Sequence, residues 1–290
     1  MTRISTVATC RCRGGEGPLW DPAEQALFYI DNTGQKAHRY IPAAGIAKSW
    51  VMPSVITAMA LRQRGGAVVA LRTGIHSFNF ETGALQVIKP LEPGSRIVFN
   101  DGKVDRRGRF VIGASTSNFT NPTPDGGLLT LSADHHLDSL DEGIYFSNGP
   151  CWSPDDRVLY FADSYKYEIY AYDYDIETGK VANRRVFVNT RELGGMPDGA
   201  TVDCEGRLWS ALYGGGKVVA FRPDGSLERV IEMPVRFSSS VMFGGRDLSD
   251  LYVTTIEHNE GGAPVEEDAG AVYIIEGTGA RGVPEPRWAG

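Results

Sequence analysis

The chain alternates short apolar runs with turn-forming residues, and one such phrase recurs along its length. Each copy opens on a polar residue, continues through small and apolar residues, turns at Asp or Gly, and ends in an apolar, often aromatic strand. Six copies occupy 16–31, 57–73, 100–115, 148–164, 198–213 and 239–256, and successive copies begin 41 to 50 residues apart. One four-stranded propeller blade takes about 40 to 50 residues. The repeat therefore predicts six blades.

Further strand-like segments with period-two alternation follow the phrases, for example at 74–80, 168–174 and 217–221. No window of about a dozen residues shows a helical period, so we expect almost no helix. The 35 glycines and 16 prolines agree with many tight turns. A β-sandwich or a double barrel is the alternative for such repeats. We favour an all-β, six-bladed β-propeller that forms a single domain over 1–290.

The residues that open the six phrases are candidates for a common site. In a propeller the innermost strand of each blade lines a central channel, so these residues should share one mouth of it. They are Glu16, Thr57, Asn100, Asn148, Asp198 and Ser239. Buried carboxylates without a partner cost several kcal/mol, and a divalent cation removes that cost. Glu16 and Asp198 match its charge, and Asn148 adds a neutral oxygen. In the alternative interpretation these residues only cap strand ends and bind water.

Composition narrows the classes of partner and compartment. The net charge of −7 lacks the basic footprint of a nucleic-acid binder, so neither nucleic acid nor an anionic membrane is expected as a partner. Residues 1–15 lack the apolar run of a signal peptide, and no stretch reaches the roughly 18 apolar residues of a membrane helix. We therefore expect a cytoplasmic protein.

The four cysteines, Cys10, Cys12, Cys151 and Cys204, are too few and too unevenly spaced for a disulfide framework. Cys10 and Cys12 form a C-x-C without a second pair. We expect them to be ordinary strand residues rather than ligands of a structural metal.

Several ordered motifs carry a resemblance to a known family. They are Gly-Glu-Gly-Pro-Leu-Trp at 15–20, Phe-Asn-Asp-Gly-Lys-Val-Asp at 99–105, Ser-Asn-Gly-Pro-Cys-Trp-Ser-Pro-Asp at 147–155 and Pro-Asp-Gly-Ala-Thr-Val-Asp at 197–203. Over nearly its whole length the chain resembles the regucalcin, gluconolactonase and luciferin-regenerating enzyme family. The resemblance implies one divalent metal at the channel mouth, held by Glu16, Asn148 and Asp198. It also implies Asp198 as general base and Asn100 near substrate or metal.

Departures from the family concern substrate recognition. Animal regucalcins carry an Arg two residues before the Asn of the third motif, where this chain has Val98, and Asn118 stands approximately where the family has a Glu. We therefore expect Arg96 and Asn118 to contact substrate, with Arg72 and His76 as further candidates. Specificity for glucono-lactone is not carried over.

The leading hypothesis is a hydrolase acting on a carboxylic ester, in which metal-activated water opens an aldono-1,4- or 1,5-lactone to the aldonic acid. The metal is Ca²⁺, Zn²⁺, Mn²⁺, Mg²⁺ or Fe(II), since such oxygen donors accept several ions. No G-x-S-x-G elbow signals a serine nucleophile. The alternatives are a calcium-binding regulatory protein, or a hydrolase of another ester or of a modified-sugar lactone. The expected partner is the small sugar lactone alone, and a monomer is the default because a propeller exposes no edge that demands a second chain.

Overall fold

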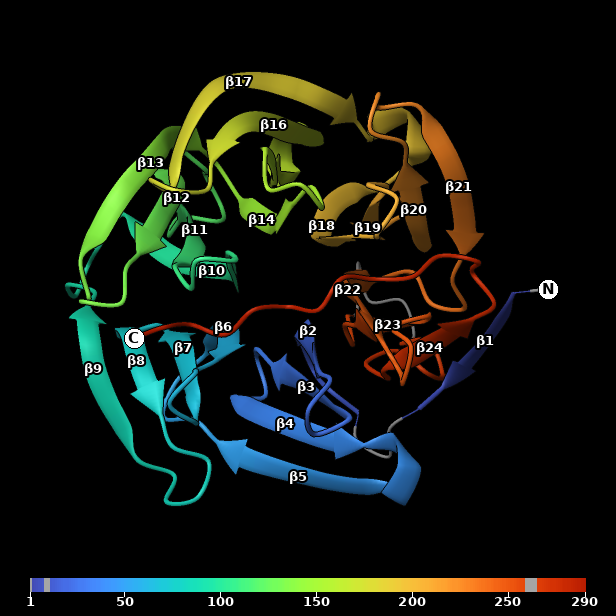
Figure 1. Ribbon diagram of the computed structural model, residues 1–290, viewed down its shortest axis with the longest axis horizontal. Coiled ribbons are helices and arrows are strands. Elements are labelled where there is room, and N and C mark those ends of the chain that lie inside the picture. Colours follow the sequence, from blue (N-terminus) through green and yellow to red (C-terminus); the bar gives the residue numbers. More distant parts are fainter. Residues whose placement is uncertain (1, 8–10, 259–264) are drawn as a thin grey trace.

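The computed structural model describes residues 2–7, 11–258 and 265–290. Its strands form six four-stranded antiparallel sheets arranged around one axis (Figure 1), so the prediction of a six-bladed β-propeller is confirmed. In the described residues the only helices are three single 3-10 turns, η1 (Pro42–Ala44), η2 (Ser164–Lys166) and η3 (Arg191–Leu193). None of the described helices is long and apolar enough to cross a membrane.

The first three blades follow one another along the chain. The first contains β2 (Gly15–Asp21), β3 (Ala26–Asp31), β4 (Lys36–Ile41) and β5 (Ile46–Val51). The second contains β6 (Ile56–Leu61), β7 (Ala67–Leu71), β8 (Gly74–Phe78) and β9 (Leu85–Pro90). The third contains β10 (Ile97–Val104), β11 (Phe110–Thr116), β12 (Gly126–Leu131) and β13 (Leu137–Ile144).

The last three blades complete the ring. The fourth contains β14 (Ser147–Trp152), β15 (Val158–Asp163), β16 (Glu168–Asp175) and β17 (Lys180–Asn189). The fifth contains β18 (Met196–Val202), β19 (Leu208–Tyr213), β20 (Lys217–Phe221) and β21 (Leu227–Glu232). The sixth contains β22 (Ser238–Gly244), β23 (Asp250–Thr255), β24 (Tyr273–Glu276) and, as its outermost strand, β1 (Arg3–Thr6). The first strand of the chain thus pairs with the last strand in one blade, which closes the ring.

Burial explains why the strands differ in sequence across each blade. The second strands, such as β3 (ALFYID) and β7 (AVVAL), are buried along their whole length and read as continuous apolar runs. Strands covered on both faces need no polar alternation. The outermost strand β5 is mostly exposed and carries polar residues. The hydrophobic core therefore lies between neighbouring blades, where for example the Trp20 and Tyr252 rings stack at 5.5 Å between the first and sixth.

Every innermost strand is distorted where its phrase opens. The register of pairing with the second strand shifts between Glu16 and Leu19, Ile56 and Ala58, Phe99 and Gly102, Asn148 and Cys151, Pro197 and Ala200, and Ser238 and Ser240. Such β-bulges bend a strand and re-aim side chains, and they are frequent beside functional sites. Gly17 and Gly149 adopt positive φ angles of 52° and 57° within them, a conformation that glycine tolerates best. Four of the opening residues lie within the bulges, outside the paired ladder, and the bulges of the first and fourth blades begin directly after the paired residues Glu16 and Asn148.

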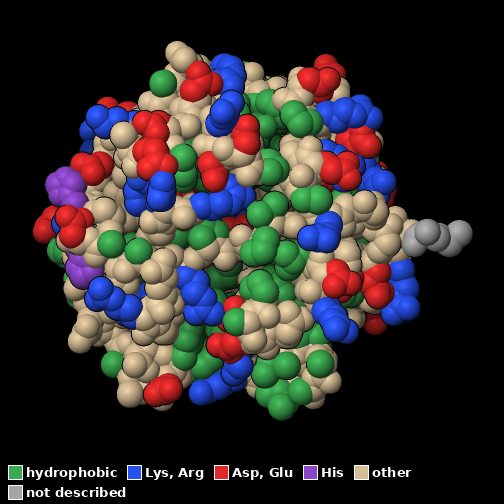
Figure 2. All heavy atoms as spheres, viewed as in Figure 1, with side chains coloured by type: hydrophobic (Ala, Val, Ile, Leu, Met, Phe, Trp, Pro, Cys, Tyr) green, Lys and Arg blue, Asp and Glu red, His purple; other side chains and the backbone are tan. Residues whose placement is uncertain are grey.

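The chain beyond β24 crosses the opposite end of the channel, where the inner strands turn back into their hairpins (Figure 1). The backbone N–H of Cys204 donates to Arg281 O at 2.8 Å, that of Trp288 to Leu61 O at 2.8 Å, and that of Ala289 to Gly108 O at 3.0 Å. These bonds tie the segment to the fifth, second and third blades. Figure 2 shows this face without an open hole at its centre. Among the described residues, the pocket that the phrase-opening residues line lies at the other end of the channel.

Candidate metal centre at the channel mouth

A pocket of about 310 Å³ lies at the mouth, and five of the six phrase-opening residues line it. They are Glu16, Thr57, Asn100, Asn148 and Asp198. The repeat thus brings these side chains together from five blades. The sixth, Ser239, is buried between blades instead, where its hydroxyl donates to Gly15 O at 2.6 Å.

Of the two predicted acidic ligands Asp198 is buried and Glu16 is half-buried, and neither has a compensating charge among the described residues. Burial raises the pKa of Glu16 well above its usual value, and the nearby carboxylates of Asp198 and Asp101 raise it further. Burial likewise raises the pKa of Asp198, with Asp101 adding to the effect. Among the described residues no Lys or Arg pairs with Glu16 or Asp198. A divalent cation would supply the missing positive charge, so the donor set fits such an ion.

A hydrogen-bond chain fixes the two asparagines and crosses three blades. Asn100 Nδ2 donates to Ser147 O at 2.7 Å and to Asn148 Oδ1 at 3.0 Å, and Asn148 Nδ2 donates to Ser164 Oγ at 2.9 Å. Ser164 Oγ donates in turn to Pro197 O at 2.6 Å. Because the terminal acceptors are carbonyls, the direction of each bond is fixed. Asn148 Oδ1 keeps a lone pair for a cation. Asn100 presents Oδ1, since both its N–H groups are used.

Asp101 is a pocket residue that the repeat did not single out, although it stands next to Asn100 in the third motif. Its Oδ1 accepts the N–H of Gly102 at 2.8 Å and its Oδ2 accepts the N–H of Gly149 at 2.9 Å. Burial raises its pKa, and the cation of Lys103 partly opposes that shift. Asp101 therefore holds the bulge of β14 against that of β10 and adds a third carboxylate to the pocket.

Aromatic side chains form one wall of the pocket. Phe146, Tyr165 and Tyr213 line it, and the Phe146 and Tyr165 rings stack with centroids 5.1 Å apart. Phe119 packs against Phe146 at 5.8 Å from the loop between β11 and β12. A pocket with a polar floor and an aromatic wall suits a small molecule that carries both kinds of surface.

Arg96 and Asn118, which we expect to contact substrate, do not line this pocket. Arg96 pairs with Asp125 at 3.0 Å and its side chain is 78% exposed. Asn118 Oδ1 accepts the N–H of Asn121 at 3.0 Å within the same loop. Asn118 therefore belongs to the β11–β12 loop that carries Phe119, and Arg96, which directly precedes β10, is tied to the same loop through Asp125. Their contact with substrate stays a prediction.

The other two substrate candidates also lie outside the pocket. The guanidinium of Arg72 lies over the Phe119 ring at 5.7 Å. His76 is buried on β8, where its Nδ1 bonds to Gly74 O at 3.0 Å.

Cys12 is a buried residue of the connection between β1 and β2, so the prediction that it lies in a strand is wrong. The backbone explains this, because its N–H donates to Gly270 O at 2.8 Å rather than to a neighbouring strand. Cys10 lies outside the described residues.

The fold and the pocket define a six-bladed β-propeller with an acidic site at one mouth. The family described as the SMP-30/Gluconolactonase/LRE-like region matches residues 14–257. Regucalcin of Sus scrofa is 33% identical over 295 residues and that of Xenopus laevis 34% over 297, each match covering 99% of both chains. The chain therefore belongs to the SMP-30/gluconolactonase/LRE-like family, as its motifs indicate.

Solved structures agree with that assignment. A luciferin-regenerating enzyme superposes with a TM-score of 0.93 at 27% identity and full coverage of both chains. A gluconolactonase from Xanthomonas campestris superposes with a TM-score of 0.75 at 22% identity, covering 95% of this chain and 89% of its own. This second likeness shows the shared fold.

Proposed function

We propose that this protein is a metal-dependent lactonase that hydrolyses a sugar lactone to its aldonic acid. One observation carries the proposal: Glu16 and Asp198 line the same small pocket with raised pKa values, and none of the described Lys or Arg side chains pairs with either. Strongly perturbed acids in a pocket are typical of functional sites. The family includes gluconolactonases, and the pocket has the volume for a small cyclic ester.

Glu16, Asn148 and Asp198 are the residues that would hold the divalent cation. All three offer oxygen, which hard cations prefer. Three protein ligands leave coordination positions open, as in catalytic rather than structural sites. When bound, such a cation polarises the ester carbonyl and lowers the pKa of a nearby water.

Side chains of the pocket also transfer the proton and bind the substrate. Asp198 takes the proton of the attacking water as its oxygen adds to the carbonyl carbon, the acyl carbon–ring oxygen bond breaks, and the ring oxygen receives a proton. Asn100 Oδ1 accepts from a hydroxyl of the substrate, because its amide hydrogens are held by Ser147 and Asn148. The sugar ring lies against Tyr165 and Phe146. Asp198 acting as ligand alone is the alternative role for that residue.

The test is acid release from pentono- and hexonolactones by the metal-stripped protein, followed with a pH indicator before and after each divalent ion is added. We expect hydrolysis only with metal. E16Q and N148A should lose metal affinity and turnover together while their all-β circular dichroism is unchanged. Absence of hydrolysis of every lactone with calcium, zinc, manganese, magnesium and ferrous ion would refute the proposal.

A second candidate function rests on the relatives themselves. Regucalcins are among the matches, and one solved structure, from Agrobacterium tumefaciens, is described as a calcium-binding protein. The all-oxygen donor set also suits Ca²⁺. Tight calcium binding without lactone hydrolysis would favour a regulatory binding role over catalysis.

A further inference from the structure

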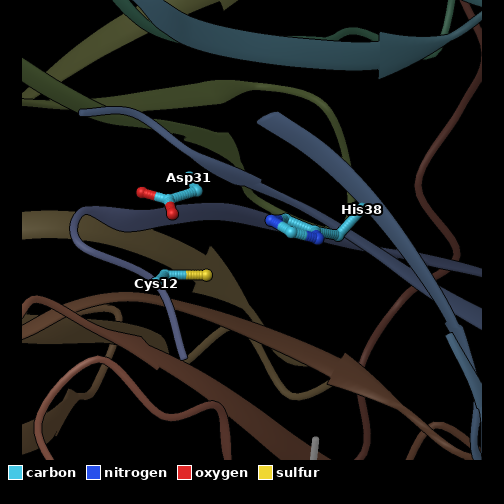
Figure 3. Close-up of side chains that lie close together, drawn as sticks. All are labelled: Cys12, Asp31 and His38. Carbon is cyan, nitrogen blue, oxygen red and sulfur yellow. The ribbon is translucent and has the colours of Figure 1, made fainter. Parts of the chain in front are cut away.

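A second group of potential ligands lies outside the residues of the channel mouth. One ligand atom each from Cys12, Asp31 and His38 lies within 4.8 Å of the other two, and all three residues are buried. Figure 3 shows the three side chains pointing toward a common space. We propose that Cys12, Asp31 and His38 form a second metal site, which binds Zn²⁺ and fastens the junction between the sixth and first blades. This site is independent of the proposed lactonase activity.

Tertiary pairing brings the three residues together. Asp31 ends β3, and His38 lies opposite Tyr29 on β4, where the two rings stack at 4.7 Å. Cys12 precedes β2, and its backbone bond to Gly270 attaches it to the sixth blade. The group thus lies where the sixth blade meets the first, on the connection that runs from β1 of the sixth blade to β2 of the first.

His38 supplies the independent sign of a ligand. Its Nε2 is buried and has no hydrogen-bond partner among the residues that the structure describes, while Nδ1 lies 2.8 Å from Ser49 Oγ. An unsatisfied polar atom in the interior costs about 1–3 kcal/mol, so such atoms call for an explanation. When Nδ1–H donates to Ser49, Nε2 carries the lone pair that a metal requires. Metal-bound histidines commonly have their second nitrogen held in this way.

The Asp31 carboxylate is held in position by the backbone. Its Oδ1 accepts N–H groups from Gly14 at 2.8 Å and Gly34 at 2.9 Å, whereas Oδ2 accepts only that of Arg13, at 3.2 Å. A carboxylate has about four acceptor positions, so Oδ2 retains one. The group is therefore oriented before a metal arrives.

The ligand types select the metal. Thiolate sulfur, imidazole nitrogen and carboxylate oxygen together favour Zn²⁺ over Ca²⁺ or Mg²⁺, which prefer oxygen alone. The thiolate and the carboxylate match the charge of a divalent ion. Cys12 packs among buried apolar residues that include Trp20, Leu27 and Met242. The group is therefore more enclosed than the pocket at the mouth, and its three residues leave the fourth position of a tetrahedral Zn²⁺ to another ligand.

The decisive experiment is cobalt substitution in the variant D198N, which disables the site at the mouth. Cys12 is the only sulfur among the proposed ligands of either site, so a thiolate-to-cobalt charge-transfer band in the near ultraviolet that disappears when Cys12 is replaced comes from this group. We expect the band in D198N and in the control D198N/C151S, and its loss in D198N/C12S. Zinc analysis should give one ion per chain in D198N and in D198N/C151S, and none in D198N/C12S.

A second measurement does not depend on removing a ligand. S49A in the D198N background should weaken zinc binding at least about tenfold in chelator competition, because the imidazole loses its orienting contact. S54A is the matched control, since that buried hydroxyl makes no hydrogen bond. A folded D198N protein without the cobalt band, or equal zinc affinity in S49A and S54A, would overturn the proposal. Both outcomes leave the lactonase test untouched.

Discussion

The two ends of the channel differ in whether their acidic side chains form ion pairs with Lys or Arg. At the mouth, Glu16 and Asp198 have no Lys or Arg partner among the residues that the structure describes. At the closed end three buried acids beside the hairpin turns each pair with an arginine: Asp105 with Arg109, Asp203 with Arg207 and Asp21 with Arg287, each at 2.6 Å. Paired acids there hold the fold together, whereas the unpaired acids at the mouth leave charge for a ligand to neutralise.

Two of these paired acids, Asp105 and Asp203, belong to a repeated motif, Asp-x-x-Gly-Arg, at 105–109 and 203–207. In the first copy Asp105 Oδ1 accepts the N–H groups of Arg107 and Arg109, closing the turn, and Oδ2 accepts the guanidinium of Arg109. Tyr174 donates a further bond to Oδ2 at 2.6 Å. Every acceptor position is used, so this carboxylate has no capacity left for a metal.

The largest effect should come from D198N. We expect at least about a thousandfold loss of lactone turnover, since a ligand and base are removed together, which corresponds to about 4 kcal/mol of activation free energy. The metal-free fold should keep or gain stability, because a buried, unpaired carboxylate is neutralised. Urea unfolding and the acid-release assay on the same sample check both statements. A large loss of stability would place Asp198 with the structural acids instead.

D105A should have the opposite effect to D198N: it should lower stability and leave turnover unchanged. Removing one partner of a buried ion pair leaves Arg109 uncompensated and costs about 3–5 kcal/mol of unfolding free energy. Turnover per folded molecule and the metal affinity should be those of the parent, because the pocket is at the other end of the blade. Equal stability of D105A and the parent in urea would contradict the contrast between the ends.

Alkaline pH should loosen the closed end. Cys151 lies there against Glu285 of the C-terminal segment, and burial raises its pKa from 9.0 to about 12. The unfolded chain therefore loses this proton first, so the thiol has no effect below pH 9 and lowers stability as the pH rises from about 9 toward 12. The slope is at most about 1.4 kcal/mol per pH unit.

Urea unfolding between pH 8 and pH 11 measures that slope. C151A should flatten it relative to the parent, while C204S, which changes an exposed thiol, should not. The same slope in all three proteins would show that Cys151 does not contribute.

The smallest effect is expected from S164A at the mouth. Ser164 joins Asn148 to Pro197 O, so its loss frees the Asn148 amide without removing a proposed ligand. We expect about a tenfold decrease in metal affinity, as is usual when an outer-shell contact is lost. The maximal rate at saturating metal should change little. A fall in that rate with unchanged affinity would place Ser164 in contact with substrate.

The sequence predicted the ring and most of its mouth because both follow from a repeat. The phase of the phrases placed Glu16, Asn100, Asn148 and Asp198 at one pocket. The phase also predicted Ser239 at the pocket. Its hydroxyl instead donates a hydrogen bond to Gly15 O between the blades, so its polar group needs no partner in the channel.

Other features depend on contacts that no local pattern records. Asp101 is out of phase with the repeat, and only its position next to Asn100 could have pointed to the pocket. Cys12 comes close to His38 only when the sixth blade packs against the first and β3 pairs with β4. Histidine spacing along a helix, the usual search for zinc ligands, does not detect ligands that strand pairing brings together. Arg96 was placed by its distance from the third motif, whereas its ion pair with Asp125 directs it to the loop.

The measurement that tests the central claim most directly is a metal titration of the stripped parent protein and of D198N, with acid release from a lactone panel as the readout. We expect activity in the parent to rise with the added ion until the mouth is filled, and D198N to stay inactive at every concentration. Metal-independent hydrolysis by the parent, or equal activity in the two proteins, would contradict a catalytic metal held by the unpaired acids.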